Sequence, residues 1–300
     1  MMSLSQPKEY KEPSEQSKVI LVMDNDECLG SWGIASAIHG LFRGYIPHNT
    51  GISVSECISV FKDCLVKYYL PNGGARPGTK ETLKLAKFYK DIGSIDSVIM
   101  FTSASNMNEW VNCLKNCLEQ YANVKGLYDM VLHKNNTESQ TSPDGATLKC
   151  MNMVREKLKY NKKSKIIMVD DKPHNIVGDG IRVVVSAYRH VVEEKYISDM
   201  IDEILDILQT KYQPKPGVKT YAPSCFKNIL KNSVLVDPNG IKREIRNNIR
   251  IHMCPSDQMY DRNLITNCAK TFIENIAPVK LTRSQSETNK LPSLNRSISL

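Results

Sequence analysis

The sequence predicts an α/β protein whose mostly parallel β-sheet is covered by helices on both faces. Short apolar runs typical of buried strands alternate with segments of helical apolar spacing between residues 18 and 210. Two of these runs, at 19–23 and 165–169, end directly in aspartates. Acids at that position are typical of the carboxyl edge of a parallel sheet, where open α/β folds bind ligands. We therefore expect a Rossmann-like sheet with a ligand site along one edge.

The expected strands are short apolar runs bounded by polar or turn-forming residues. We place them at residues 18–23, Ser97–Phe101, Tyr128–Leu132, Lys165–Val169 and Ile181–Ser186. The expected helices carry apolar residues three and four positions apart on one side. They span Gly33–Tyr45, Val54–Leu70, Thr79–Tyr89, a segment that contains Trp110 and Leu118, Ala146–Leu158, and Val191–Gln209.

Composition divides the chain into an expected domain and its flanking segments. Residues 18–210 form the α/β domain, and the helical spacing at 31–75 interrupts it as an insertion. The polar leader, 1–17, has no apolar segment of the kind found in a secretory signal. Beyond the domain, a linker and basic extension at 211–280 precede a Ser-rich tail at 281–300, whose composition predicts disorder.

The formal charge of +8 on this 300-residue chain lies entirely in its C-terminal segment. Residues 213–300 hold 14 Lys/Arg and 6 Asp/Glu, whereas residues 1–212 hold 26 of each kind. A basic segment of this kind can contact an acidic partner or a phosphate-bearing surface, and it can equally be solvated without a partner. Because the domain itself carries no excess charge, we do not expect nucleic acid as its partner.

Cysteine content and hydropathy indicate the compartment in which the protein works. The nine cysteines include no CxxC pair, so we expect free thiols in a reducing compartment rather than a zinc site or disulfide framework. No apolar stretch reaches 18 residues, so we expect no membrane span. We therefore expect an intracellular protein, cytoplasmic or nuclear.

Polar side chains follow three of the expected strands at the point where each strand ends. They are Asp24 and Asp26 in KVILVMDNDECLG, Thr102 and Ser103 after the second strand, and Asp170 and Asp171 after the fourth. The carboxyl ends of parallel strands lie on one edge, so these groups can converge. Paired carboxylates suit either a nucleophile with a neighbouring acid or base, or a divalent cation. Oxygen ligands without histidine favour Mg²⁺ over zinc, and such an ion beside a hydroxyl can hold a phosphate.

The same segments resemble motifs of the haloacid dehalogenase-like superfamily. DNDECLG resembles its first motif, DxDx(T/V), IMFTSAS resembles its second, and IIMVDDKPHNI resembles its acidic fourth motif. The pieces ARPG at 75–78, FTSAS at 101–105 and VDDKPHN at 169–175 are more similar to the phosphatases related to the CTD phosphatase and NLI-interacting-factor group. The resemblance covers residues 18–210 and implies that 31–75 forms a small cap over the site.

The resemblance implies a Mg²⁺-dependent phosphatase that works through an aspartyl-phosphate. Asp24 would be the nucleophile, and Asp26 would protonate the leaving oxygen and then activate water. The Asp24 carboxylate and the Asp26 backbone carbonyl would bind Mg²⁺, together with Asp170 or Asp171. Substrate contacts would come from Thr102, Ser103 and Arg76, although Arg76 could equally be a turn residue.

A lysine completes the implied site by neutralising charge on the phosphoryl group. Lys149, at the start of the helix before the fourth strand, is our first choice, and a plain surface lysine is nearly as compatible with its position. Lys134 is the alternative because it follows the third strand. Asn175 would orient the acidic loop.

The sequence departs from the resemblance at two places. Cys28 stands where the CTD-phosphatase-like group usually has Thr, and helical sequence at 31–75 replaces a β-rich insertion. Substrate choice is therefore the property that transfers least. We expect protein phosphoserine or phosphothreonine, with a small phosphorylated metabolite as the alternative. Cys28 and the basic tail also motivate another class, a catalytically weak scaffold or binding protein that keeps the fold.

Overall fold

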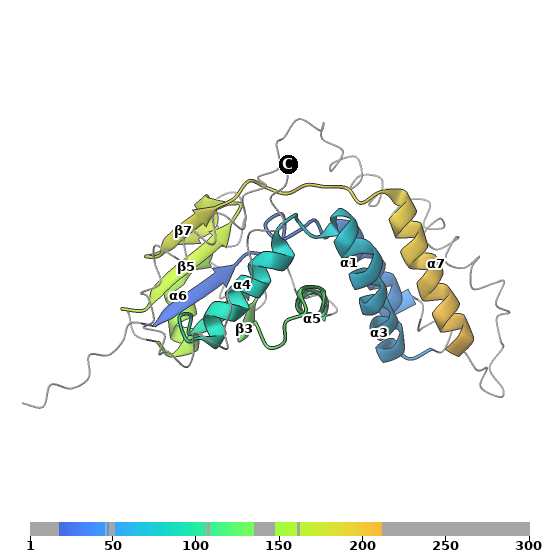
Figure 1. Cartoon of the computed structure of the whole chain (residues 1–300), viewed down its shortest axis with the longest axis horizontal. Helices are drawn as coiled ribbons and strands as arrows, with labels where there is room; N and C mark the ends of the chain where they lie inside the picture. The colour runs from blue at the N-terminus through green and yellow to red at the C-terminus, as the bar shows by residue number, and fades with distance from the viewer. Residues whose placement is uncertain are drawn as a thin grey trace, which may run out of the picture.

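A five-stranded parallel sheet lies at the centre of the computed structural model, which describes residues 18–45, 47, 52–104, 106, 109–134, 148–160 and 163–211. Its strands are β1 (Val19–Met23), β2 (Ser97–Phe101), β3 (Met130–Leu132), β5 (Lys165–Asp170) and β7 (Ile181–Val184). They lie in the order β3-β2-β1-β5-β7, and every neighbouring pair is parallel (Figure 1). The predicted Rossmann-like α/β class is confirmed.

The strand order reverses beside β1. From β1 the chain builds β2 and β3 on one side, and it then returns to place β5 and β7 on the other side. In open α/β sheets the crevice at such a reversal, outside the carboxyl ends of the strands, is the usual ligand site. Met23 pairs with Val169 in this register, so Asp24 and Asp170 lie next to each other at that crevice.

Alternate residues of each strand face opposite sides of the sheet, as the twofold period of a strand requires. On β1, Leu21 and Met23 pack into the larger core, which includes side chains of α4 (Thr79–Asp91) and α5 (Trp110–Ala122). Ile20 and Val22 pack on the other face, into a smaller core with α6 (Met151–Leu158). The central strands are therefore buried on both faces, which explains their continuous apolar runs.

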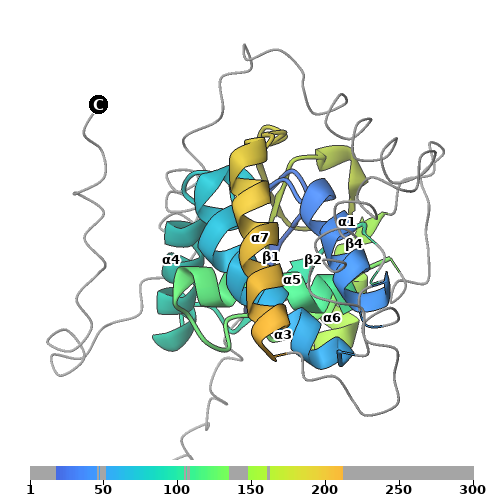
Figure 2. The same cartoon turned by 90° about the vertical axis from the view of Figure 1, so that its right-hand side faces the viewer.

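Four helical segments with described bounds lie between β1 and α4 and form the second part of the molecule (Figure 1). They are α1 (Gly33–Gly40), the π-helical η1 (Leu41–Tyr45), α3 (Val54–Cys64) and the π-helical η2 (Leu65–Gly74). The last described helix, α7 (Glu194–Lys211), packs across α3 and η2 (Figure 2). Their buried apolar residues belong to the same core as one face of the sheet.

Several expected element boundaries were wrong by a few residues. The helix predicted from Ala146 begins at Met151, and Lys149–Cys150 instead forms a short strand, β4, parallel to β6 (Ile176–Val177). Lys149 therefore lies in β4, two residues before the helix, and not at its start. The strand predicted from Tyr128 begins at Met130, and the helix predicted from Val191 begins at Glu194. A two-residue pairing depends on a partner distant in sequence, so local apolar spacing does not reveal it.

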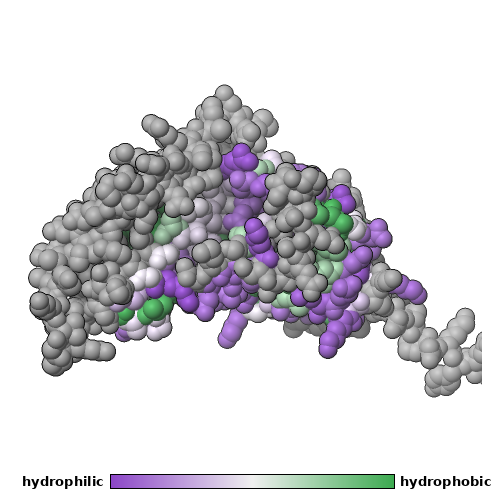
Figure 3. All heavy atoms as spheres, turned by 180° about the vertical axis from the view of Figure 1, so that it is seen from behind, coloured by the Kyte–Doolittle hydropathy of each residue, from purple (hydrophilic) through white to green (hydrophobic). Residues whose placement is uncertain are grey.

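The described surface carries few large apolar side chains. Only Val54, Val177 and Val184 are exposed among the large hydrophobic residues that the structure describes. Seen from behind, the described apolar side chains form small separate areas between hydrophilic ones (Figure 3). Across the described ranges, no helix is long and apolar enough to cross a membrane. The predicted leader (1–17), the extension beyond residue 211 and the tail at 281–300 lie outside the described residues.

Candidate active site

The loop that follows β1 is held by main-chain hydrogen bonds to the neighbouring strand and to itself. The Asp24 amide donates to the Val169 carbonyl at 2.8 Å, and the indole of Trp32 donates to the Asn25 carbonyl at 3.0 Å. Gly30 lies so close to the Trp32 ring and the Gly74 carbonyl that a Cβ atom there would approach them to 2.2 and 2.4 Å. Only glycine fits this close approach, so the turn brings the acidic loop against the end of the helical segment.

Cys28, the residue that departs from the family pattern, is fully buried behind this loop. Its thiol donates to the Val169 carbonyl with an Sγ–O distance of 3.8 Å. Burial, followed by the charges of the nearby aspartates, raises the pKa of this thiol well above its usual range. Cys28 is therefore a neutral donor that ties the loop to β5, which is a role that a threonine hydroxyl could also fill.

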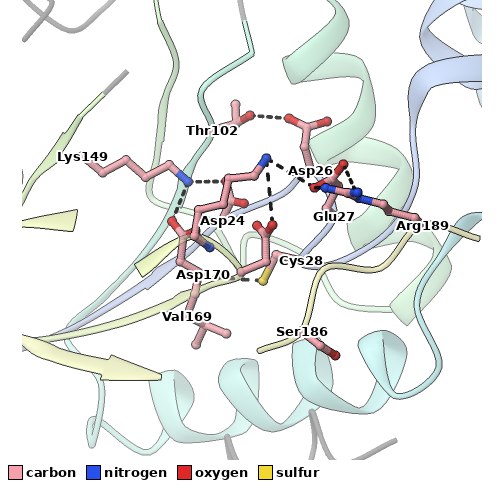
Figure 4. Close-up of polar contacts among 12 residues, drawn as sticks. Asp24, Asp26, Glu27, Cys28, Thr102, Lys149, Val169, Asp170, Ser186 and Arg189 are labelled. Carbon is pink, nitrogen blue, oxygen red and sulfur yellow. Dashed lines mark hydrogen bonds and ion pairs between the residues drawn. The ribbon is translucent and has the colours of Figure 1, made fainter. Parts of the chain in front are cut away.

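Lys149 occupies the centre of the site. Its ammonium donates to Asp24 Oδ1 at 2.5 Å and to Asp170 Oδ2 at 2.7 Å, and only 2% of its side chain is exposed (Figure 4). Burial acts to lower the pKa of Lys149, but the two carboxylates outweigh it and raise the pKa, so the ammonium stays charged. Lys134, the alternative from sequence, is exposed just beyond β3. The structure thus brings Lys149, and not Lys134, to the two aspartates.

Asp26 and Thr102 meet at the opposite side of Asp24 from Asp170 (Figure 4). The Thr102 hydroxyl donates to Asp26 Oδ2 at 2.6 Å and accepts a hydrogen bond from the Ala104 amide at 3.0 Å. Burial raises the pKa of Asp26, while the hydrogen bond from Thr102 acts in the opposite direction. A carboxyl group that holds its proton more readily than usual can donate it as a general acid and take one back as a general base.

Asp171 contributes two more carboxylate oxygens to the acidic cluster, and the Lys172 ammonium lies 4.0 Å from its Oδ2. Neither of its buried carboxylate oxygens has a hydrogen-bond partner within the described part of the chain. One ligand oxygen each from Asp24, Asp170 and Asp171 lies within 4.8 Å of the others. Three carboxylates without histidine or thiolate form a donor set that suits a hard divalent cation such as Mg²⁺. The residues present therefore fit the metal that the resemblance implies.

Burial disfavours the ionised form of the carboxyl groups in the cluster, and Lys149 does not offset this effect at Asp24. The pKa of Asp24 is raised well above its usual range, first by burial and then by the charges of Asp170 and Asp26, against the opposing charge of Lys149. Burial likewise raises the pKa of Asp171. Carboxylates in this condition gain from a cation, because it favours their ionised form.

A second charged group, which sequence reasoning did not identify, borders the acidic cluster. Glu27 Oε2 lies 3.3 Å from the Lys172 ammonium, and Glu27 Oε1 accepts a hydrogen bond from Arg189 Nε at 3.2 Å (Figure 4). Burial acts to raise the pKa of Glu27, but Lys172 and Arg189 together hold it below its usual value. Lys172 directly follows Asp170-Asp171, so its sequence position could have identified it as a site residue. Arg189 is far from the acidic motifs in sequence, and only the folded structure places it at the site.

The remaining predicted residues lie around the cluster in different roles. Arg76 is buried, and its guanidinium donates to the Cys28 carbonyl at 3.3 Å and to the Ser186 carbonyl at 2.7 Å. It thus ties the acidic loop to the segment after β7, and a substrate contact stays a prediction. Ser103 is half-buried beyond β2. Asn175 is buried at the end of η4 (Pro173–Asn175), where its backbone N–H donates to the Lys172 carbonyl at 3.0 Å.

Comparisons with known proteins provide little information about the function of this site. No protein-family model matches the sequence, and no curated protein matches it. Among solved structures, a protein from Bacteroides fragilis described as a haloacid dehalogenase-like hydrolase aligns over 56% of this chain and 98% of its own, with 12% identity and a TM-score of 0.30. An identity and a TM-score this low carry no information about activity, so function has to be inferred from the site itself.

Proposed function

We propose that the protein is a Mg²⁺-dependent phosphatase of the haloacid dehalogenase-like type, which hydrolyses phosphomonoesters through an aspartyl-phosphate. One observation carries the proposal. At the point where the strand order reverses, the Lys149 ammonium joins Asp24 to Asp170, and a second carboxyl group, Asp26, lies beside Asp24 with its own hydroxyl donor. A nucleophile, an acid/base group and a fixed cation are the parts that this reaction requires.

In the first step a carboxylate oxygen of Asp24 attacks phosphorus. The new P–O bond to Asp24 forms as the P–O bond to the leaving group breaks, and Asp26 gives its proton to the leaving oxygen. Asp26 is then ionised and takes a proton from a water molecule, whose oxygen attacks phosphorus and releases the Asp24 carboxylate. The Lys149 ammonium, fixed and buried, neutralises charge on the phosphoryl oxygens in both steps.

Mg²⁺ would be held by Asp24, Asp171 and Asp170, with the Asp26 carbonyl as the further ligand that the resemblance implies. When bound, the ion would supply positive charge beside the phosphoryl oxygens. The protein's own contribution there is Asp171, whose two oxygens accept no hydrogen bond from any described residue. Asp170 is less open, because Lys149 and the Lys172 amide already donate to its two oxygens.

The central test is the hydrolysis of para-nitrophenyl phosphate by the full-length protein, with Mg²⁺ and with a chelator. We expect activity only with the metal, and a loss of at least about 10³-fold in kcat for Asp24→Asn, because the amide cannot attack phosphorus. Beryllofluoride should occupy Asp24 in the wild type and not in the variant. Normal turnover by Asp24→Asn would refute the aspartate nucleophile, and metal binding without any turnover would favour the scaffold class.

The metal is tested separately through Asp171→Asn. Mg²⁺ should raise the melting temperature of the wild type, because a ligand at 100 times its Kd adds about 2.7 kcal/mol to the stability of the folded state. We expect this rise to disappear in Asp171→Asn and to persist in Asp179→Asn, a change at an exposed acid nearby. If both variants respond to Mg²⁺ as the wild type does, then Asp171 is not a ligand.

We further propose protein phosphoserine or phosphothreonine as the substrate. The support is the resemblance of ARPG, FTSAS and VDDKPHN to the CTD-phosphatase and NLI-interacting-factor group. A screen of phosphopeptides against small phosphorylated metabolites, read as kcat/KM, decides between the two substrate classes. A preference for metabolites would refute the protein substrate while leaving the phosphatase chemistry intact.

A further inference from the structure

A second chemical site lies away from the acidic cluster, in a pocket between the helical segment and α5. The pocket has a volume of about 150 Å³ and is lined by His39 at the end of α1, Lys62 on α3 and Cys113 on α5. Its lining also includes Asn112 and Asn116, which are exposed and give it access to solvent. None of these residues takes part in the proposed phosphatase reaction.

His39 is the first observation that points to a ligand or reaction there. Its side chain is 1% exposed, and its Nε2 atom has no hydrogen-bond partner among the residues that the structure describes. The ring packs against Phe61 and Trp110, with centroid distances of 5.5 and 5.2 Å, so its position is fixed by its neighbours. A buried ring nitrogen without a partner loses hydrogen-bond energy unless something enters the pocket or exchanges a proton with it.

Cys113 is the second observation. Of the described cysteines, it is the one that lines this pocket, and 6% of its surface is exposed, whereas Cys57 and Cys117 are fully buried. A hydrogen bond from Cys117, one helical turn further along α5, lowers the pKa of Cys113 below the usual thiol value, and a hydrogen bond with His39 and the charge of Lys62 act in the same direction. Reactive cysteines lie beside groups that favour the thiolate, such as histidine and lysine side chains.

The charges around Cys113 come from each element that packs against it. His39 lies on α1 and Arg43 on η1, while Lys62 and Asp63 lie on α3. Cys117 belongs to α5, and Glu109 directly precedes that helix. Arg43 and Glu109 pair with each other at 3.1 Å, which leaves His39 and Lys62 as the groups next to the thiol. Lys62 therefore brings a positive charge to the pocket beside the thiol, while Asp63 on the same helix carries the opposite charge.

We propose that Cys113 is a site of reversible oxidation by a peroxide, with His39 as the base that takes the proton of the thiol. The sulfur attacks one oxygen of the peroxide, so that an S–O bond forms and the O–O bond breaks. Sulfur is oxidised by two electrons to sulfenic acid and the peroxide is reduced. With hydrogen peroxide the leaving hydroxide receives the proton from His39 and departs as water, while Lys62 stabilises the developing negative charge.

Sulfenic acid, and not a disulfide between Cys113 and Cys117, is the expected product. The two residues lie four positions apart in an intact helix, where Cβ atoms are about 5–6 Å apart. A disulfide requires about 3.5–4.5 Å between Cβ atoms, so α5 would have to unwind to form one. The group is also not a metal site, because no three ligand atoms near Cys113 lie within 4.8 Å of one another in the described ranges.

The first test treats the full-length protein with a small excess of hydrogen peroxide in the presence of dimedone, and locates the adducts by peptide mapping. We expect roughly tenfold more adduct on Cys113 than on Cys57, a fully buried thiol of the same region, and no adduct at position 113 in Cys113→Ser. Equal labelling of Cys113 and Cys57, or labelling confined to other cysteines such as the half-buried Cys150, would overturn the proposal.

The second test measures the pH midpoint of alkylation of Cys113 by iodoacetamide. We expect a midpoint below that of an ordinary thiol, whose pKa is about 8.5, in the wild type, and a shift toward that value in His39→Phe, which keeps an aromatic ring at this position. Cys117→Ala should shift it upward, whereas Cys117→Ser should shift it less because the hydroxyl still donates. An alkylation midpoint that stays the same in both His39→Phe and Cys117→Ala would overturn the proposal. If His39→Phe does not fold, the comparison of Cys117→Ala with Cys117→Ser takes its place, and equal midpoints in those two variants and the wild type would overturn it.

Discussion

At the scale of single residues, Lys149 decides how the acidic cluster is arranged. Its ammonium is the only described cation that contacts both Asp24 and Asp170, and its side chain is almost fully buried. A buried ion pair contributes little net stability relative to apolar residues, but the loss of one partner leaves an uncompensated charge. The position is therefore much more sensitive to substitution than a surface lysine.

We expect Lys149→Met to lower the free energy of unfolding by about 3–5 kcal/mol in the absence of metal. Two buried carboxylates then lose their cation while the apolar part of the side chain is kept. Lys134→Met is the matched control, because Lys134 is exposed and its change should stay within about 0.5 kcal/mol. Urea unfolding measures the free energy of unfolding of both variants. If the two substitutions lower it equally, the buried contacts of Lys149 do not contribute more to stability than an exposed lysine does.

At the scale of secondary-structure elements, α7 closes the molecule over the helical segment. Its Met200, Ile204 and Leu208 are fully buried in the larger core. On its polar side, Glu203 accepts hydrogen bonds from Lys67 at 2.7 Å and from Tyr68, which connects α7 to η2. The apolar face supplies most of the attachment, because ion pairs at the surface are screened by solvent.

The contact at Glu203 gives a pH-dependent prediction. Its hydrogen bonds from Lys67 and Tyr68 lower the pKa of Glu203, so its stabilising contribution is present above the unfolded value of about 4.3 and is lost as pH falls through the lower folded value. Glu203→Gln should therefore lower the melting temperature slightly at pH 7, and this deficit should shrink as the pH falls below the unfolded value. Asp202→Asn, at the exposed neighbouring acid, should not change the melting temperature. A deficit for Glu203→Gln that is as large at pH 3 as at pH 7 would contradict this explanation.

At the scale of the whole molecule, the excess positive charge lies in the part of the sequence that follows the described residues. Residues 213–300 carry the entire formal charge of +8, and the described core ends at Lys211. We propose that this basic segment contacts an acidic partner or a phosphate-bearing surface. Such contacts depend strongly on ionic strength, because salt screens them within about 10 Å at 0.1 M.

Retention on heparin, a polyanion, tests this charge separation. The full-length protein should bind at low salt, and a chain that ends at residue 212 should not, since its Lys/Arg and Asp/Glu are equal in number. Removal of residues 281–300 alone takes away only 3 Lys/Arg and 1 Glu, so it should lower the eluting salt concentration slightly. Equal retention of the full-length and shortened chains would place the binding surface on the domain instead.

Much of the fold and part of the site could be predicted because they depend on local patterns. β1, β2 and β5 are buried on both faces, so each is a continuous apolar run that reads as a strand. The positions of Asp24 and Asp170 follow from where those strands end. Element boundaries such as β4 were missed, because its two residues pair with β6, more than twenty positions away.

The sequence by itself determined the class of fold and the kinds of group that gather at one edge, because buried strands and their terminal acids leave a local pattern. Only the tertiary structure brought Lys149 to Asp24, brought Arg189 to Glu27 and placed His39 beside Cys113. These contacts join residues 70 or more positions apart, and for Lys149 and Asp24 the separation is 125. Residues so far apart in sequence come into contact only when whole helices and strands pack together, and the local spacing of residues does not predict that packing.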